Sequence, residues 1–305
     1  MRSSVRIGLW VLLGLGLASS ATPAAEADAA CLACHRGLSA KAVAALEASP
    51  HRAREGTGPP APGCVTCHGA SSAHLQGPGK GERGPEVQFG SGPHASPPEQ
   101  QNAPCLSCHQ GREQMHWPGS PHDKAGVKCS DCHRIHEPAA ASAAADKQAA
   151  VQACTACHLQ QGAEIHYASA HPLRDGQMQC SDCHNPHGEA ASGGSVLGLA
   201  NETCFRCHAE KRGPFLWEHP PATENCADCH RPHGSLHPAL LTARAPWLCQ
   251  QCHLAQFHPS TLYSGSGLPG DTRPSGAQGL LARNCMNCHP QVHGSNHPSG
   301  SRLTR

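Results

Sequence analysis

Apolar residues are concentrated at the N-terminus of this chain. Residues 7–17 form an apolar run that follows the basic residues Arg2 and Arg6, and small residues come after it. This pattern is typical of a secretory signal peptide, because the run is too short to cross a bilayer comfortably. We expect residues 1–24 to be cleaved from an exported protein. No later segment is long and apolar enough to form a membrane-spanning helix.

The rest of the chain predicts short elements. It is rich in turn-forming residues, with 32 Gly and 27 Pro, and these residues interrupt regular structure. We expect a mostly irregular fold with short α-helices and little or no β-structure. The Ala-rich segment 138–157 is the exception, and it predicts one longer helix because Ala is the best helix former.

The composition does not support an ordinary protein core. Leu, Ile, Val and Phe together make up about 13% of the residues, and aromatic residues only 3%, whereas folded domains have at least roughly 20% of the former group. Such a chain resembles a disordered one, yet its formal net charge is only +1, which does not fit the charge signature of disorder. A group outside the polypeptide therefore supplies the apolar mass. The low charge also argues against a nucleic-acid partner.

All twenty cysteines belong to one motif, Cys-x-x-Cys-His, which occurs ten times. We number these sites 1–10 in chain order. Their cysteine pairs are Cys31 and Cys34, Cys64 and Cys67, Cys105 and Cys108, Cys129 and Cys132, Cys154 and Cys157, Cys180 and Cys183, Cys204 and Cys207, Cys226 and Cys229, Cys249 and Cys252, and Cys285 and Cys288. The histidines that follow are His35, His68, His109, His133, His158, His184, His208, His230, His253 and His289.

The spacing has a chemical reason. Residues three apart on a helical turn lie on one face, so two thiols can form thioethers with one haem while the next histidine binds its iron from the proximal side. Zinc sites do not need a histidine after each pair, and neither do disulfides. A thioredoxin-like pair needs a βαβ context that is missing here. We expect ten covalent haem c groups.

Fifteen other histidines supply candidate distal ligands, whereas Met is rare. Bis-His ligation is therefore the economical interpretation, and it predicts low-potential haems. One class precedes a motif and comprises His51, His122, His171 and His219, with His258 as a further candidate. The other class follows a motif and comprises His74, His136, His187, His233 and His293, where His297 competes with His293. Four histidines break the pattern and are expected not to be ligands: His94, His116, His166 and His237.

The two classes alternate along the chain and define an internal repeat. Between Cys105 and Cys249, motifs two apart begin 49, 50 and 45 residues from each other. This period indicates a two-haem module.

Three stretches carry a family resemblance: residues 179–188, 204–219 and 285–300. They resemble the MtrA/DmsE-type periplasmic decahaem cytochromes, a group that includes MtoA-like and PioA-like proteins. The resemblance implies an elongated multihaem cytochrome c with bis-His ligation and two five-haem halves, placed at residues 25–176 and 177–305. It maps the distal ligands to the positions selected above, with either His293 or His297 as the tenth.

The resemblance also implies partners and a location. Members sit inside an outer-membrane β-barrel porin and pass electrons between the periplasm and the cell surface, in metal reduction, iron(II) oxidation or dimethyl sulfoxide respiration. A cell-surface multihaem cytochrome and a periplasmic or inner-membrane cytochrome are further expected partners. No small-molecule substrate is expected.

The leading hypothesis is an electron conduit rather than an enzyme. A multihaem oxidoreductase needs one iron with an open position, and here ligands are abundant and no Cys-x-x-Cys-Lys variant occurs. A free periplasmic electron shuttle is the other alternative, and only the resemblance argues against it.

Overall fold

The computed structural model describes residues 23–52, 62–77, 84–111, 114, 116–137, 146–188, 196–253, 284–298 and 300–304. Residues 1–22 of the predicted signal peptide lie outside this part. The chain divides into two compact units, residues 1–96 and 97–305. The boundary that we predict between two five-haem halves, at residues 176/177, falls inside the second unit, and the division into halves stays a prediction.

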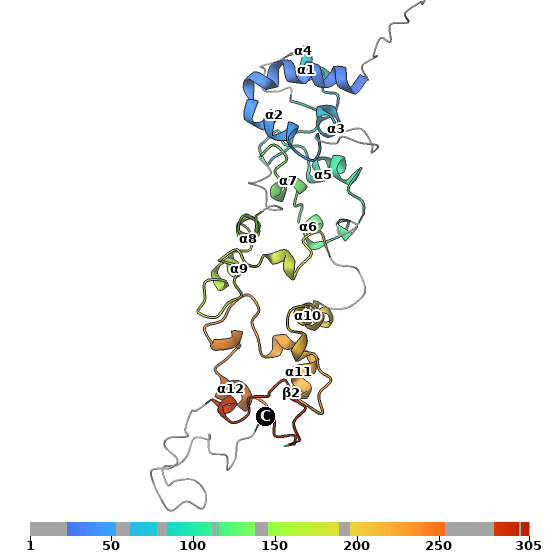
Figure 1. Ribbon diagram of the computed structural model, residues 1–305. Coiled ribbons are helices and arrows are strands. Elements are labelled where there is room, and N and C mark those ends of the chain that lie inside the picture. The colour runs from blue at the N-terminus through green and yellow to red at the C-terminus, as the bar shows by residue number, and fades with distance from the viewer. Residues whose placement is uncertain are drawn as a thin grey trace, which may run out of the picture. The chain divides into compact units, whose positions relative to one another are not determined.

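The described residues form short helices joined by irregular segments, as the sequence predicts (Figure 1). The first unit contains α1 (Pro23–Leu38), α2 (Ala40–Glu47), α3 (Cys64–His68) and α4 (Ser72–Gln76). The second unit contains α5 (Pro98–Leu106), α6 (Pro121–Lys124), α7 (Cys129–Cys132), α8 (Lys147–Thr155), α9 (Leu159–Glu164), α10 (Val196–Phe205), α11 (Pro220–Glu224) and α12 (Ala245–Gln250). It also has the 3₁₀ turns η3 (Cys180–Asp182), η4 (Ala209–Lys211), η5 (Cys226–Asp228), η6 (Pro238–Leu240) and η7 (Cys285–Asn287).

Proline and glycine set many of the helix boundaries. α5, α6, α11 and α12 each have Pro in their first two positions, where the missing N–H costs nothing. α3 lies between Gly63 and Gly69, and Gly69 has a φ of 77°, a left-handed conformation that favours glycine. The turn-forming composition therefore produces helices of one to a few turns.

The helix that we predicted over residues 138–157 is wrong in its extent. α8 begins at Lys147 because Asp146 has an extended backbone and its side chain accepts a hydrogen bond from the N–H of Gln148 at 2.9 Å. This N-cap contributes about 1 kcal/mol to helix stability and prevents one continuous helix through residue 146. Residues 138–145 lie outside the described part.

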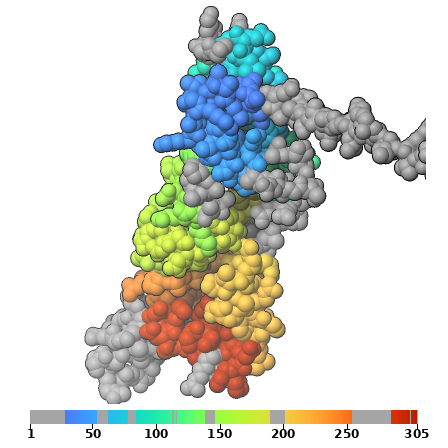
Figure 2. Space-filling view, turned by 45° about the horizontal axis from the view of Figure 1, so that its top comes forward, coloured from blue at the N-terminus to red at the C-terminus, as the bar shows by residue number. Residues whose placement is uncertain are grey.

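Strand structure is minimal in the described part of the chain. β1 (Trp217–Glu218) and β2 (Gly294–Ser295) pair antiparallel, with Trp217 opposite Ser295 and Glu218 opposite Gly294. In Figure 2 the C-terminal segment, coloured red, lies beside the gold segment that precedes β1. The indole N–H of Trp217 also donates to the carbonyl oxygen of His297 at 3.0 Å, so this pairing anchors the residues that follow site 10.

Few apolar side chains are buried in the part of the chain that the structure describes. They are Ala45, Trp117, Val151, Ile165, Leu173 and Ala245. One small cluster joins Val151, Ile165 and Leu173, with Met178 and Cys180 against it. This agrees with the low apolar content of the sequence. None of the described helices combines the length and the hydropathy that a bilayer span requires.

Candidate haem-attachment sites

Every Cys-x-x-Cys-His motif forms a helical turn, and odd and even sites do so differently. The odd sites lie in or at the end of the longer helices α1, α5, α8, α10 and α12. The even sites are single turns, α3, α7, η3, η5 and η7, and each begins at the first cysteine. In sites 3–10 the N–H of the motif histidine donates to the carbonyl of the first cysteine at 2.8–3.0 Å. This bond holds the motif as one turn, the geometry that haem attachment needs.

The two cysteines of a motif differ in exposure. The first cysteine is partly buried at every site. The second cysteine is partly buried at Cys67 and Cys229 and exposed at the other sites, namely Cys34, Cys108, Cys132, Cys157, Cys183, Cys207, Cys252 and Cys288. Because free cysteine is normally among the most buried residue types, this exposure is consistent with thiols that a covalently bound haem covers.

Five of the second cysteines lie within the backbone turn of their own site. Cys34 lies within α1 and Cys67 within α3. The N–H groups of Cys108, Cys207 and Cys288 each donate to the carbonyl of the first cysteine of their own site at 3.1–3.2 Å. These contacts fix the turn and not a sulfur–haem bond, so the thioether role of these five residues, as of all twenty cysteines, stays a prediction.

A capping contact joins the two sites of a module, by which we mean an odd site and the even site after it. The side-chain oxygen of Asn102 accepts a hydrogen bond from the N–H of Cys129 at 2.8 Å. Asn201 does the same for Cys226 at 2.9 Å, and Asp28 for Cys64 at 2.7 Å. All three acceptors lie three residues before the first cysteine of an odd site. Sequence reasoning missed this signal, which an internal alignment of the modules reveals.

The first cysteines of each module lie together. A hydrogen bond from the Cys154 thiol lowers the pKa of Cys180 to about 7, and the same contact from Cys105 lowers the pKa of Cys129. Burial raises the pKa of Cys226 to about 11, and the nearby Cys204 adds to this shift. The remaining modules show the same proximity between Cys249 and Cys285 and between Cys31 and Cys64.

Sites of neighbouring modules also lie near each other. Burial raises the pKa of the Cys132 thiol, and Asp131 and Cys157 of site 5 contribute. Burial also raises the pKa of two further thiols, and a cysteine of the next module contributes to each shift. Cys183 lies near Cys204, and Cys229 lies near Cys252. From site 3 to site 10, each attachment site is therefore adjacent to the next one in the chain.

Seven proximal histidines each face one of the predicted distal histidines. Their ring centroids are 6.0–6.4 Å apart. The pairs are His35/His74, His133/His187, His158/His122, His184/His233, His208/His171, His230/His293 and His253/His219.

This separation fits one iron between two imidazoles. A ring nitrogen binds a metal at about 2.0–2.1 Å and lies about 1.1 Å from its ring centroid, so two axial rings have centroids about 6.2–6.4 Å apart. Direct ring stacking brings centroids to about 4.5–7 Å, but stacking does not explain why each pair joins one motif histidine to one spare histidine. The residues present fit a six-coordinate haem iron.

The pairs cross between modules in both directions. At the boundary between sites 3–4 and sites 5–6, His122 reaches forward to His158, and His187 reaches back to His133. The same exchange recurs at the next two boundaries, with His171/His208 and His233/His184, then His219/His253 and His293/His230. Each module therefore gives one histidine to each neighbour in this part of the chain.

Backbone carbonyls orient several of these imidazoles. The Nδ1 of His122 lies 2.7 Å from the carbonyl oxygen of Pro186, and that of His171 lies 2.7 Å from Pro232. His230 makes the same contact with Ala239 at 2.8 Å. Because a carbonyl only accepts, Nδ1 carries the proton, which leaves Nε2 free to bind a metal.

The other predicted ligands are placed by different contacts. The Nδ1 atoms of the proximal His68 and His289 lie 3.2 Å and 2.6 Å from the carbonyl oxygens of Val87 and Arg302. The proximal His109 closes the turn of site 3. Two predicted distal residues, His51 and His136, follow α2 and α7 in short turns, and their assignment stays a prediction.

Three further predictions concern single histidines. His258 lies outside the described residues. The ring of His293 faces His230, whereas the backbone carbonyl of His297 accepts the indole hydrogen bond near β1. His94, His116, His166 and His237 are in none of the seven pairs, and their expected non-ligand role stays a prediction.

None of the twenty cysteines forms a disulfide. Within the described residues, no three His, Cys, Asp or Glu side chains gather into a group that could hold a metal ion. Paired Cys-x-x-Cys-His turns define instead a multihaem c-type cytochrome, an electron-transfer protein that binds haem c covalently.

Comparisons with known proteins give the family. Residues 171–213 and 219–257 match the doubled CXXCH motif family, and residues 64–157 match the NrfB-like cytochrome c-type proteins. The multihaem cytochrome MtrA of Shewanella baltica (strain OS185) is 46% identical over 278 residues, which cover 90% of this chain and 80% of the relative. The chain therefore belongs to the MtrA family of multihaem c-type cytochromes.

Proposed function

We propose that this chain carries ten haem c groups, each with its iron between two imidazoles, and that it conducts electrons between the periplasm and the cell surface. The observation that carries the proposal is the set of seven ring pairs at 6.0–6.4 Å. The ten Cys-x-x-Cys-His motifs of the sequence support the haem count. When bound, each haem supplies an iron that changes between the ferric and ferrous states.

The chain's own residues prepare each site for electron transfer rather than for substrate chemistry. A proximal and a distal histidine would hold each haem iron from both sides, which would leave no coordination site for a substrate. Hydrogen bonds from Nδ1 to backbone carbonyls fix the ring orientation, so the ligands change little between redox states. The adjacency of successive sites from 3 to 10 supports electron hopping along the chain in sequence order.

The proposed setting is an outer-membrane β-barrel porin reached from the periplasm. The apolar run at residues 7–17 supports export. The 46% identity with MtrA, over 90% of this chain, supports the same placement for both proteins. A cell-surface multihaem cytochrome on one side and a periplasmic or inner-membrane cytochrome on the other complete the route.

The test is co-purification with the barrel. The tagged protein is expressed with its candidate porin, and membranes are extracted with a mild detergent. We expect a stable complex of the cytochrome and the porin. Recovery entirely in the free periplasmic fraction, with the porin present in the membrane, would contradict the conduit and favour a soluble shuttle.

A further inference from the structure

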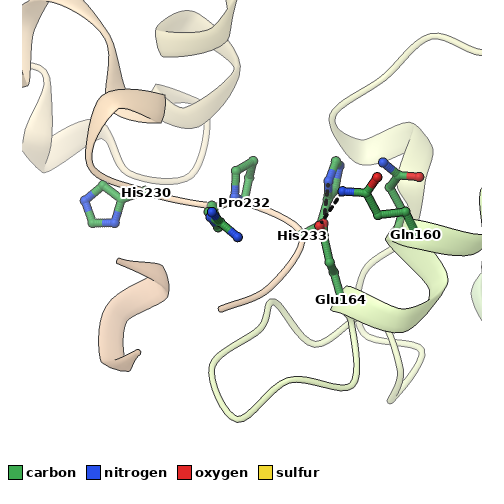
Figure 3. Close-up of a pocket in the computed structure, with 7 residues that line it drawn as sticks. Gln160, Glu164, His230, Pro232 and His233 are labelled. Carbon is green, nitrogen blue, oxygen red and sulfur yellow. Dashed lines mark hydrogen bonds and ion pairs between the residues drawn. The ribbon is translucent and has the colours of Figure 1, made fainter. Parts of the chain in front are cut away.

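Glu164, the last residue of α9, lies against one of the paired histidines. Its Oε2 is 3.5 Å from the Nδ1 of His233, and its side chain is only 14% exposed. One turn earlier in α9, the amide of Gln160 donates a hydrogen bond to the other carboxylate oxygen at 2.9 Å. Figure 3 shows Glu164 pointing at His233 with Gln160 beside it. The carboxylate is therefore held from two sides in a half-buried pocket.

Main-chain contacts hold His233 close to Glu164. Ser169 and Ser235 exchange two backbone hydrogen bonds, at 3.0 and 2.7 Å, and Ser235 is buried. This bridge places Gly234 directly against the end of α9, where any side chain would collide with the carbonyl oxygen of Glu164. The position of His233 relative to Glu164 thus depends on main-chain contacts rather than on a flexible surface loop.

The acceptor at His233 differs from those at three other paired imidazoles. The Nδ1 atoms of His122, His171 and His230 face backbone carbonyls, which carry no net charge. Another carboxylate, Glu210, lies 3.9 Å from the Nδ1 of His208, but it is 62% exposed and 3.8 Å from the ammonium of Lys211. Solvent and Lys211 screen that charge.

We propose that Glu164 is a positioning residue that orients His233 and lowers the reduction potential of the iron bound between His184 and His233. A carboxylate that accepts the Nδ1 proton makes the imidazole a stronger donor to the metal. Its negative charge also favours the more positive ferric iron, and half-burial preserves this effect. The inference rests on the proposed function, because it requires an iron in this ring pair.

Because of its position, Glu164 affects one particular step of electron transfer along the chain. Glu164 follows site 5 on α9, whereas the iron that it tunes belongs to site 6. The thiols of Cys154 and Cys180 show that these two sites are adjacent. Glu164 therefore sets the driving force of the step between haems 5 and 6, and the lowered potential raises the energy of an electron on haem 6.

The experiment is a potentiometric titration of the intact holoprotein, followed by magnetic spectroscopy. Glu164→Gln retains the shape and the contact with Gln160 but removes the charge. We expect one haem component to shift to higher potential and its low-spin resonance to change, while the number of low-spin haems stays the same. Glu164→Asp retains the charge, and we expect its potentials to lie nearer the wild type than those of Glu164→Gln.

Glu210→Gln is the matched control, because it removes an exposed carboxylate near another paired histidine. We expect no shift from it. Unchanged potentials in Glu164→Gln, or equal shifts in Glu164→Gln and Glu164→Asp, would overturn the inference. These results are distinct from failure of the proposed function, which appears in the wild-type protein as fewer than ten low-spin haems.

Discussion

Three paired histidines, His122, His171 and His230, show how the two ring nitrogens divide their roles. Nδ1 lies against a backbone carbonyl, such as Pro186 O or Pro232 O, which leaves Nε2 for the predicted iron. Those two prolines directly precede His187 and His233, which are predicted distal histidines of other ring pairs. The residue before one predicted ligand thus orients a second one from an earlier part of the chain, so these contacts connect the predicted ligands.

The ring pairs predict which iron opens when one histidine is lost. His187 pairs with His133, so His187→Ala should expose the iron of site 4, although His187 directly follows site 6. We expect one high-spin haem in ten and binding of added imidazole at that haem. Absorption and magnetic spectra of the holoprotein measure both effects. His166→Ala is the control, and high-spin iron in the control alone would contradict the assignment.

Acid should weaken the binding of the paired imidazoles once the pH falls below about 6.5. Burial lowers the pKa of His133, His233 and His293 below the ordinary 6.5. Because the unfolded chain takes up these protons first, stability is present above about pH 6.5 and is lost as the pH falls below it.

The measurement is a pH titration of the oxidised holoprotein, monitored by its low-spin absorption spectrum. We expect the spectrum to stay constant from pH 8 to about 6.5 and to lose low-spin character at lower pH. Loss of low-spin iron as the pH rises through this range would contradict the predicted direction of the pH dependence.

At the residue scale, the sequence predicts which histidines are ligands better than it predicts which two histidines form a pair. The motif predicts every proximal residue, and the alternating classes contain all seven distal residues of the ring pairs. The pairing itself depends on contacts such as His230 with His293, which are far apart in the chain. Glu164 was missed for the same reason, because no local pattern relates α9 to His233.

Among the elements, the odd and even sites of a module have complementary roles. In three modules, the helix that contains the odd site supplies the side chain that caps the even site. Asn102 in α5 is 4% exposed, accepts from the N–H of Cys129 and donates to the carbonyl of Val127 at 3.1 Å. Asn201 makes equivalent contacts with Cys226 N–H and the carbonyls of Thr223 and Glu224.

Removing this cap should destabilise the module. Asn102→Ala leaves partly buried backbone groups at Cys129 and Val127 without this partner, and we expect a loss of about 1–3 kcal/mol in the free energy of unfolding. Denaturant unfolding of the holoprotein measures the change. Glu99→Ala, an exposed change in the same helix, should cost far less. Equal losses in both variants would contradict the capping role.

Asp28→Asn offers a second test in the other unit. The amide oxygen still accepts from Cys64, although the ion pair with Arg52 at 2.7 Å is lost. The cap therefore remains, and the loss should be smaller than for Asp28→Ala.

The short helices follow directly from the Gly and Pro content, and their positions at the motifs follow from the attachment chemistry. Two features of the elements could not be predicted in this way. The start of α8 depends on the Asp146 cap within an Ala-rich run, where propensity alone favours a longer helix. The pairing of β1 with β2 joins residues 217 and 295, a contact that no local signal indicates.

For the whole molecule, cross-linking replaces the missing core. Few apolar side chains of the described residues are buried, and the ring pairs would join each module in residues 97–298 to its neighbours through two irons. Every such link closes a loop of the chain and so restricts the unfolded state, much as metal binding drives folding in small metalloproteins.

The haem-free chain should therefore not fold. The mature polypeptide, produced without haem attachment, is expected to give a circular dichroism spectrum that changes gradually on heating. A cooperative unfolding transition in that apoprotein would contradict the role of the haems in stability.

The most direct test of the account is the number of low-spin haems per mature chain, counted by quantitative magnetic spectroscopy of the oxidised protein. Two imidazoles at each of ten irons predict ten low-spin haems and no high-spin signal. Fewer than ten haems, or a high-spin component in the wild-type protein, would contradict the assignment of twenty cysteines and twenty histidines to a continuous row of closed sites.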